Sequence, residues 1–251
     1  MKISHTFSFL LVLFALLQPA LASAEPGHSG KGLTYYVTRV VYPAAEKKGV
    51  TLTAHNKTSR SWLVQSFIRP VDPATGSIDI HNARHINAPF IVTPPLERLE
   101  ANGELTVRIR RNAEPLPQDR ESVFFIAMKA IPAEKTDAKP QSENKVVLAV
   151  VNSMKVFYRP EGLEKYAIED VAAELRFTRQ GDALIAKNPT PYWLTFARLS
   201  VGKNTLDKAQ LRLMVPPKGE QTYRFPQGAA GQVEWQLIDE DGWHTEPLKQ
   251  D

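Results

Sequence analysis

Cysteine is absent from this chain of 251 residues. Without disulfides the fold depends on buried apolar surface, and a chain of this length can build one large or two small cores. Histidine is also sparse, and among its six positions only His81 and His85 lie close together. Their stretch, Ile78–Ile86, lacks the helical stripe that would bring an i, i+4 pair onto one ion. We therefore expect no metal site and no cofactor.

The motifs of common enzyme classes are missing as well. The chain has no cysteine nucleophile, no Gly-x-Ser-x-Gly turn and no glycine-rich phosphate loop. An acidic cluster, Asp239-Glu240-Asp241, could bind calcium or act as an acid/base pair, but the Gly242 that follows favours a solvated turn between strands. We therefore expect no catalytic residues and no enzymatic activity.

Strong charge of one sign is lacking. The formal net charge is +4, and acidic residues are interleaved with basic ones, as in Glu161–Glu174. A nucleic-acid surface would gather lysine and arginine on one stripe with stacking aromatic residues. Nucleic-acid binding is therefore not expected.

Only one long apolar run is present, and it lies at the start of the chain. Lys2 precedes a run from Phe7 to Ala22, and Ala22-Ser23-Ala24 follows as a small-residue cleavage site. This order predicts a secretory signal peptide over residues 1–24. No later segment is apolar enough to span a bilayer, so we expect an exported chain without stable membrane insertion.

Short alternating segments separated by Pro, Gly, Asn and Asp fill the rest of the chain, and no amphipathic helix is convincing. This pattern predicts an all-β protein of two immunoglobulin-like β-sandwich domains, residues 25–160 and a smaller one over residues 161–251. The expected strands of the first are Tyr35–Tyr42, Gly49–His55, Trp62–Arg69, Phe90–Val92, Glu104–Arg110, Val123–Ile131 and Val146–Tyr158. Those of the second are Ala172–Thr178, Ala183–Asn188, Trp193–Val201, Gln210–Val215, Gln221–Phe225 and Val233–Ile238.

One predicted strand, within Asn144–Pro160, is apolar on both faces. Val146, Leu148 and Val150 alternate with further apolar residues, which is more than a half-buried antiparallel strand needs. The strand is either buried on both faces inside a sandwich or offered to another chain by β-strand addition. The pattern alone leaves both interpretations open.

Two cations interrupt apolar strands. Arg39 lies within Val37–Tyr42, and Lys155 lies within Met154–Tyr158. A buried unpaired cation is costly, so each must find an anion or reach solvent. Either an internal salt bridge satisfies them, or both point into a cleft between the domains and clamp a carboxylate at the C-terminus of another chain.

Several segments in order resemble the PapD-like family of periplasmic pilus chaperones. They are Thr38–Pro43, Pro89–Leu99, Leu116–Ser122, Ile131-Pro132, Lys155–Pro160 and, in the second half, Lys187–Thr195. The resemblance covers most of the mature chain. It implies two sandwiches set at an angle, in a boomerang, with a cleft between them, and it implies location in the periplasm.

The resemblance also implies a function and a set of residues. Arg39 and Lys155 match the pair that anchors the carboxylate at the C-terminus of a pilus subunit. Val146, Leu148 and Val150 match the donor strand that completes the subunit's fold, and an outer-membrane usher would receive the subunit. Glu121 and Arg159 match a structural salt-bridge network between the domains, whose third acid would be Glu240 or Asp239. A free chaperone could also cap its strand by dimerising.

A second class of function shares this fold. A secreted adhesion or carbohydrate-binding module could use the same sandwiches, because a fold does not fix a function. Such a module predicts an aromatic-lined site in the loops and has no need of a lysine in the long apolar strand.

Overall fold

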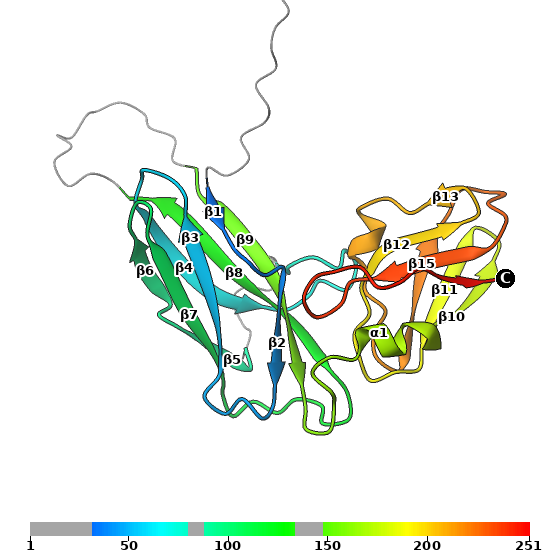
Figure 1. Ribbon diagram of the computed structural model, residues 1–251, viewed down its shortest axis with the longest axis horizontal. Helices are drawn as coiled ribbons and strands as arrows, with labels where there is room; N and C mark the ends of the chain where they lie inside the picture. The colour runs from blue at the N-terminus through cyan, green and yellow to red at the C-terminus, as the bar shows by residue number, and fades with distance from the viewer. Residues whose placement is uncertain (1–31, 80–87, 134–147) are drawn as a thin grey trace, which may run out of the picture. The chain divides into compact units, whose positions relative to one another are not determined.

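The structure is a computed structural model that describes residues 32–79, 88–133 and 148–251 (Figure 1). The expected signal peptide over residues 1–24 lies outside the described residues, as do His81, His85 and Val146. Within the described residues, no helix is both long and apolar enough to cross a membrane.

Two sheets form the first sandwich. One has the order β1-β3-β7-β5 and the other the order β2-β9-β8-β4-β6. Strand β7 alternates strictly, so Leu105, Val107 and Ile109 point into the core while the residues between them face solvent. The bounds are β1 Leu33–Thr34, β2 Arg39–Pro43, β3 Val50–Asn56, β4 Trp62–Arg69, β5 Phe90–Thr93, β6 Leu96–Leu99, β7 Glu104–Arg111, β8 Ser122–Pro132 and β9 Val150–Arg159.

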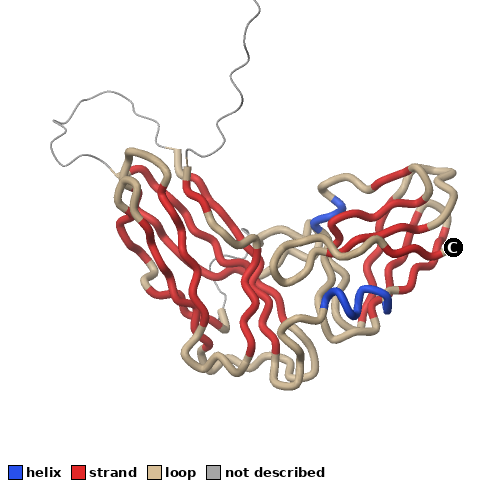
Figure 2. The backbone as a smooth tube through the Cα atoms, viewed as in Figure 1, coloured by secondary structure: helices blue, strands red, loops and turns tan. Residues whose placement is uncertain are grey.

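Two further sheets form the second sandwich, with the orders β10-β11-β14 and β13-β12-β15-β16. Its apolar core is separate from that of the first sandwich. The fold is therefore all-β with two sandwiches, as predicted, and helix is confined to short turns (Figure 2). The bounds are α1 Ile168–Val171, η1 Ala172–Glu174, β10 Arg176–Gln180, β11 Ala183–Asn188, β12 Phe196–Val201, β13 Asn204–Thr205, η2 Gln210–Arg212, β14 Gly219–Arg224, β15 Val233–Leu237 and β16 Leu248–Gln250.

One strand prediction in the second half was wrong and another was wrong in part. The stretch Gln210–Val215 forms η2 and then a single bridge at Val215, without a strand, and Ala172–Thr178 begins with η1 and is a strand only from Arg176. Short segments with a few apolar residues fit a strand and a helical turn equally well, so alternation could not separate them. The chain also forms a last strand, β16, which pairs with β15 although little chain remains after Trp243.

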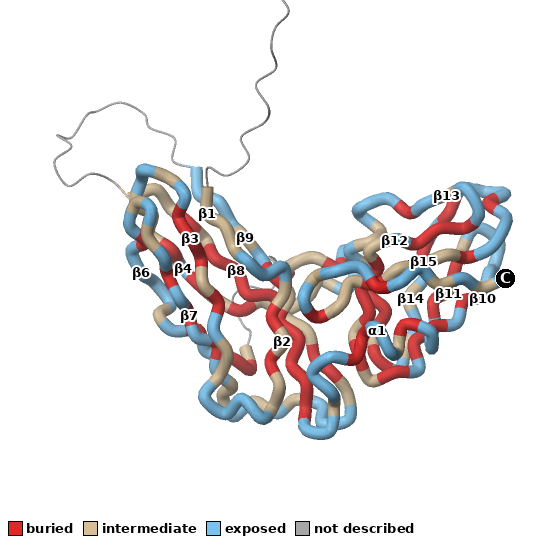
Figure 3. The backbone as a smooth tube through the Cα atoms, in the orientation of Figure 1, coloured by how far each residue is buried: buried red, intermediate tan, exposed pale blue. Residues whose placement is uncertain are grey.

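Strand β9 is mostly exposed in its first half and mostly buried in its second (Figure 3). Val150 and Val151, on opposite faces, are 52% and 51% exposed, whereas Val156 and Tyr158 are buried in the first core. Phe157 is also buried but lies on the other face, against residues of the second half of the chain. The strand is therefore buried on both faces only in its second half.

Candidate functional site

Arg39 and Lys155 lie side by side. Strand β2 pairs with β9 in parallel, and the register makes Arg39 the direct partner of Lys155. Paired residues on neighbouring strands project from the same face of a sheet, so both cations belong to one site. The fold thus brings together two residues that are far apart in the sequence.

The guanidinium of Arg39 is held by neighbouring backbone and by an aromatic ring. Its Nη1 donates a hydrogen bond of 2.8 Å to the carbonyl oxygen of Ile238, and the group lies 5.5 Å from the centre of the Phe157 ring. Its Nε has no hydrogen-bond partner among the described residues. Burial lowers the pKa of Arg39 to about 10, so the side chain is charged at neutral pH.

The charge of Lys155 has fewer stabilising contacts than that of Arg39. Within the described part of the chain its Nζ makes no hydrogen bond, and no carboxylate lies within ion-pair distance of either Lys155 or Arg39. Burial, and then the positive charge of Arg39, lower the pKa of Lys155 to about 7. The described residues therefore do not supply the internal salt bridge that the sequence left open as an alternative.

A hollow of about 380 Å³ lies against Lys155 and gives an anion room to approach. Its polar wall includes Ser153 and Arg212, and the residues lining it are Gly76, Ser77, Ile78, Phe125, Ser153, Lys155 and Arg212. Sequence reasoning missed Arg212, because a cation in a short 3₁₀ turn forms no motif with a strand elsewhere in the chain.

An unpaired strand edge leads to the two cations. Strand β8 pairs with β9 from Val150 to Tyr158, but β2 covers the opposite edge only from Lys155 onward. No described backbone group pairs with that edge over residues 150–154. Of the expected donor residues, Val150 lies at the start of β9, while Leu148 precedes the strand and is 76% exposed. Backbone groups and apolar side chains are thus both available to an added strand.

A buried ion network lies next to this site. Arg159 Nε is 2.7 Å from Glu121 Oε1, and Arg159 Nη1 is 2.8 Å from Glu240 Oε1. Glu121 also accepts a hydrogen bond from the backbone N–H of Trp193, at 2.8 Å. Burial raises the pKa of Glu121 against the opposing influence of Arg159.

Glu240, rather than Asp239, is the acid that reaches Arg159. Its Oε1 also accepts hydrogen bonds from the backbone N–H groups of Ala167 and Ile168, at 2.9 and 3.3 Å. Asp239 turns into its own loop instead, where its Oδ1 accepts from the N–H groups of Asp241 and Trp243. The network therefore joins Glu121, the residue before β8, to the end of β9 and to the loop after β15.

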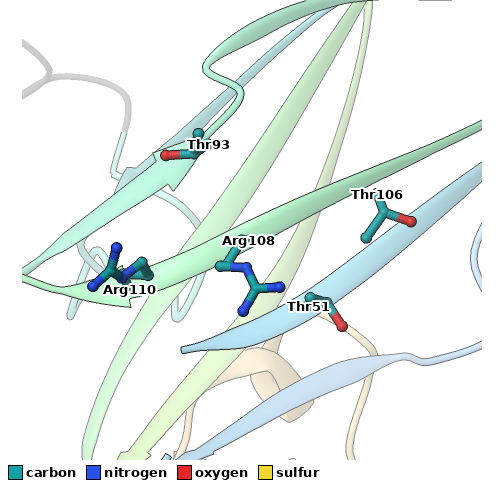
Figure 4. Close-up of a pocket in the computed structure, with 5 residues that line it drawn as sticks. All are labelled: Thr51, Thr93, Thr106, Arg108 and Arg110. Atoms are coloured by element: carbon teal, nitrogen blue, oxygen red, sulfur yellow. The ribbon is translucent and has the colours of Figure 1, made fainter. Parts of the chain in front are cut away.

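Another hollow, of about 260 Å³, lies on the outer face of the sheet that contains β3, β7 and β5 (Figure 4). It is lined by Thr51, Thr93, Thr106, Arg108 and Arg110. These side chains are exposed, and none pairs a nucleophile with a base. Among the described residues there is also no group of three or more potential metal ligands from His, Cys, Asp and Glu.

An open strand edge that ends at two cations without ion-pair partners among the described residues, on a pair of β-sandwiches, defines a class of protein that binds an extended segment of another chain. Comparison of the sequence with known families narrows this class to one family. Residues 32–164 match the family model of the pili and flagellar-assembly chaperone, PapD N-terminal domain, and residues 170–248 match that of the pili assembly chaperone PapD, C-terminal domain. The chain belongs to this family of pilus assembly chaperones, which is not a family of enzymes.

Individual relatives agree with this assignment. The chain is 34% identical over 240 residues to the chaperone protein FimC of Escherichia coli K12, covering 95% of this chain and 91% of FimC. A solved complex of the Salmonella enterica SafA pilin with the SafB chaperone contains a chain that is 32% identical, with a TM-score of 0.72 and coverage of 87% of this chain and 95% of that one. The periplasmic chaperone SfaE is also 32% identical, with a TM-score of 0.65 and coverage of 87% and 98%. These relatives favour a chaperone over the adhesion module.

Proposed function

We propose that this protein is a periplasmic chaperone that binds pilus or fimbrial subunits and delivers them to an outer-membrane usher. The observation that carries the proposal is the open edge of β9 over residues 150–154, which ends beside Arg39 and Lys155. A similar chain is the chaperone in a complex with a pilin. No nucleotide is required, because a subunit's own folding and strand exchange can release it.

The open edge supports donor-strand complementation. An extended segment of a subunit adds to β9 through backbone hydrogen bonds, while Leu148 and Val150, spaced by two, insert into the subunit's groove. Val146 extends this series from outside the described residues. An exposed apolar edge is otherwise an aggregation hazard, so its retention supports a role in binding. A dimer that covers this edge is a natural resting state of the free chain.

The two cations supply the register of the bound subunit. Arg39 and Lys155 hold the carboxylate at the C-terminus of the subunit by charge-assisted hydrogen bonds, which fixes where the added strand ends. The network of Glu121, Arg159 and Glu240 keeps a structural role and does not contact the subunit.

A periplasmic location requires that the chain be exported. Residues 1–24 form a signal peptide that is removed after Ala24, and the mature chain comprises an N-terminal domain over residues 25–160 and a C-terminal domain over residues 161–251. The SfaE chaperone, a similar protein, is described as periplasmic.

Co-expression with a subunit that lacks its last strand tests the function. We expect the subunit to be recovered from the periplasm together with the wild-type chain, and recovery to fall about tenfold with Leu148→Asn/Val150→Asn, because polar groups bind poorly in an apolar groove. The matched control, Ile91→Asn/Leu96→Asn, alters side chains of similar exposure on other strands and should recover the subunit fully. Full recovery with the Leu148/Val150 variant contradicts the donor strand, and no recovery with the wild-type chain contradicts the function.

Subunit binding should weaken as the pH rises above 7. In the free chain Lys155 has a pKa of about 7, and an arriving carboxylate favours the ammonium form and raises that pKa. Above pH 7 binding therefore takes up a proton, so the dissociation constant should increase by up to about tenfold per pH unit.

Calorimetric titration between pH 6 and pH 9, with a peptide that carries the last residues of a pilus subunit and ends in a free carboxylate, measures this dependence. Lys155→Arg is the control, because arginine stays charged over the whole range and should give a flat profile. A wild-type profile as flat as that of Lys155→Arg would count against Lys155 as an anchor.

A further inference from the structure

An exposed tryptophan stands out in the loop between β15 and β16. Trp243 is 74% exposed, whereas Trp62 and Trp193 are half-buried and Trp235 is buried. The indole N–H groups of those three donate hydrogen bonds to Thr58 Oγ1, Glu121 O and Ala172 O respectively. The indole of Trp243 donates to none of the described residues. Trp243 therefore offers both an apolar ring and a free hydrogen-bond donor.

The loop that carries Trp243 is closely hydrogen-bonded. The N–H of Trp243 donates to Asp239 Oδ1 at 2.7 Å, and its carbonyl oxygen accepts from the N–H of Asp239 at 2.9 Å. The N–H of Gly242 donates to Asp239 O at 3.2 Å. The backbone beneath the indole is thus ordered before any partner binds, which lowers the entropy cost of using this side chain in an interface.

This loop also lies directly beside the candidate anchor. Ile238, which precedes it, accepts the hydrogen bond from Arg39. Gly242 has a φ of +94°, and a Cβ at that position would come within 2.3 Å of Thr38 Oγ1, next to Arg39 in the chain. Glu240 is fixed by Arg159. Contacts on both sides of the loop thus hold Trp243 in the neighbourhood of Arg39.

We propose that Trp243 packs against the last residues of the bound subunit, close to the residue whose carboxylate Arg39 and Lys155 hold. This inference rests on the proposed function and adds a contact from the second sandwich to it. A tryptophan suits this partner, because its ring covers apolar side chains of many shapes and its N–H can donate to a backbone carbonyl of an extended chain. Such a contact can bind an extended segment whatever its exact sequence.

Fluorescence tests the inference directly, because Trp243 is the exposed tryptophan and should dominate any change in emission on binding. The peptide that carries the last residues of a pilus subunit should shift the emission of the wild-type chain to shorter wavelength. Trp243→Phe should still bind but lose the shift, and Trp243→Ala should bind about tenfold more weakly by calorimetry. Ile91→Ala, at an exposed apolar residue of β5, is the control and should match the wild type in both measurements.

The outcomes separate this inference from the proposed function. Peptide binding at unchanged affinity in Trp243→Ala, with no emission shift in the wild type, would overturn the role of Trp243 and leave the chaperone function standing. Absence of peptide binding by the wild type would overturn the function itself. A shift that depends on the concentration of the chain alone would assign Trp243 to a contact between two copies and would also overturn the inference.

Discussion

Replacing Lys155 by methionine is expected to weaken subunit binding while leaving the free chain at least as stable as the wild type. Truncating one partner of a buried charge pair costs about 2–5 kcal/mol, which corresponds to roughly 30-fold to several-thousand-fold in affinity. Methionine keeps the buried stem but removes an ammonium group that has no described partner. The expected result is opposite signs for binding and stability, which is typical of a residue kept for function.

The pH dependence of stability has a definite sign. The folded chain lowers the pKa of Lys155 to about 7, below that of an unfolded lysine, so between about pH 7 and pH 10.5 the unfolded state binds more protons. The penalty for burying the charge is therefore full below pH 7 and fades as the pH rises. The gain in stability from Lys155→Met should be largest below pH 7 and should vanish at high pH.

Arg39→Met should weaken subunit binding by a factor similar to that expected for Lys155→Met, but it should not stabilise the chain. Its Nη1 donates to the carbonyl of Ile238, and removing that donor leaves a partly buried acceptor unsatisfied. Affinity is measured by calorimetry with the same peptide from the end of a pilus subunit, and stability by urea denaturation. Lys57→Met removes an exposed cation in the turn that follows β3 and is the control. Binding within threefold of wild type by both Lys155→Met and Arg39→Met contradicts the carboxylate anchor.

Much of the fold follows from alternation of apolar and polar residues. Segments such as Trp62–Arg69 and Glu104–Arg110 form strands β4 and β7 with almost the expected bounds, because one face of each is buried and the other is solvated. The edge strand β6, Leu96–Leu99, was missed, because it is short and has two charged residues at its centre. The stretch Tyr35–Tyr42 is a strand only from Arg39 onward, since β1 and β2 belong to different sheets.

The candidate site was harder to predict from residues alone. The sequence shows that Arg39 and Lys155 interrupt apolar strands, but that they are partners follows from the parallel pairing of β2 with β9, a tertiary feature. Resemblance to the family supplied that link. Arg212 and Trp243 carried no signal, because an exposed cation or aromatic residue in a turn looks the same in sequence wherever the turn lies.

Replacing Arg159 by methionine is expected to destabilise the chain by about 3–5 kcal/mol, because it leaves two buried carboxylates without a cation. The side chains of Glu121 and Glu240 are 0% and 5% exposed, and Arg159 contacts both. Urea denaturation at pH 7 measures the loss. The matched control is Arg120→Met, whose partner Asp119 is 52% exposed, and its stability should stay close to that of the wild type because solvent screens the pair.

The stability lost in Arg159→Met should depend on pH in a definite direction. Without the arginine, burial raises the pKa of Glu121 further above that of the unfolded chain. The folded variant then binds more protons than the unfolded one, so its stability falls as the pH rises through the raised pKa of Glu121, and the loss of stability should be larger at pH 8 than at pH 5.

A triple variant separates charge from packing. Glu121→Gln/Arg159→Met/Glu240→Gln removes all three charges and should recover part of the lost stability, since amides are less costly to bury than carboxylates. This variant keeps the test decisive if Arg159→Met alone does not fold. A single variant within 1 kcal/mol of wild type, or a triple variant less stable than the single one, would show that the network does not stabilise the chain by pairing its charges.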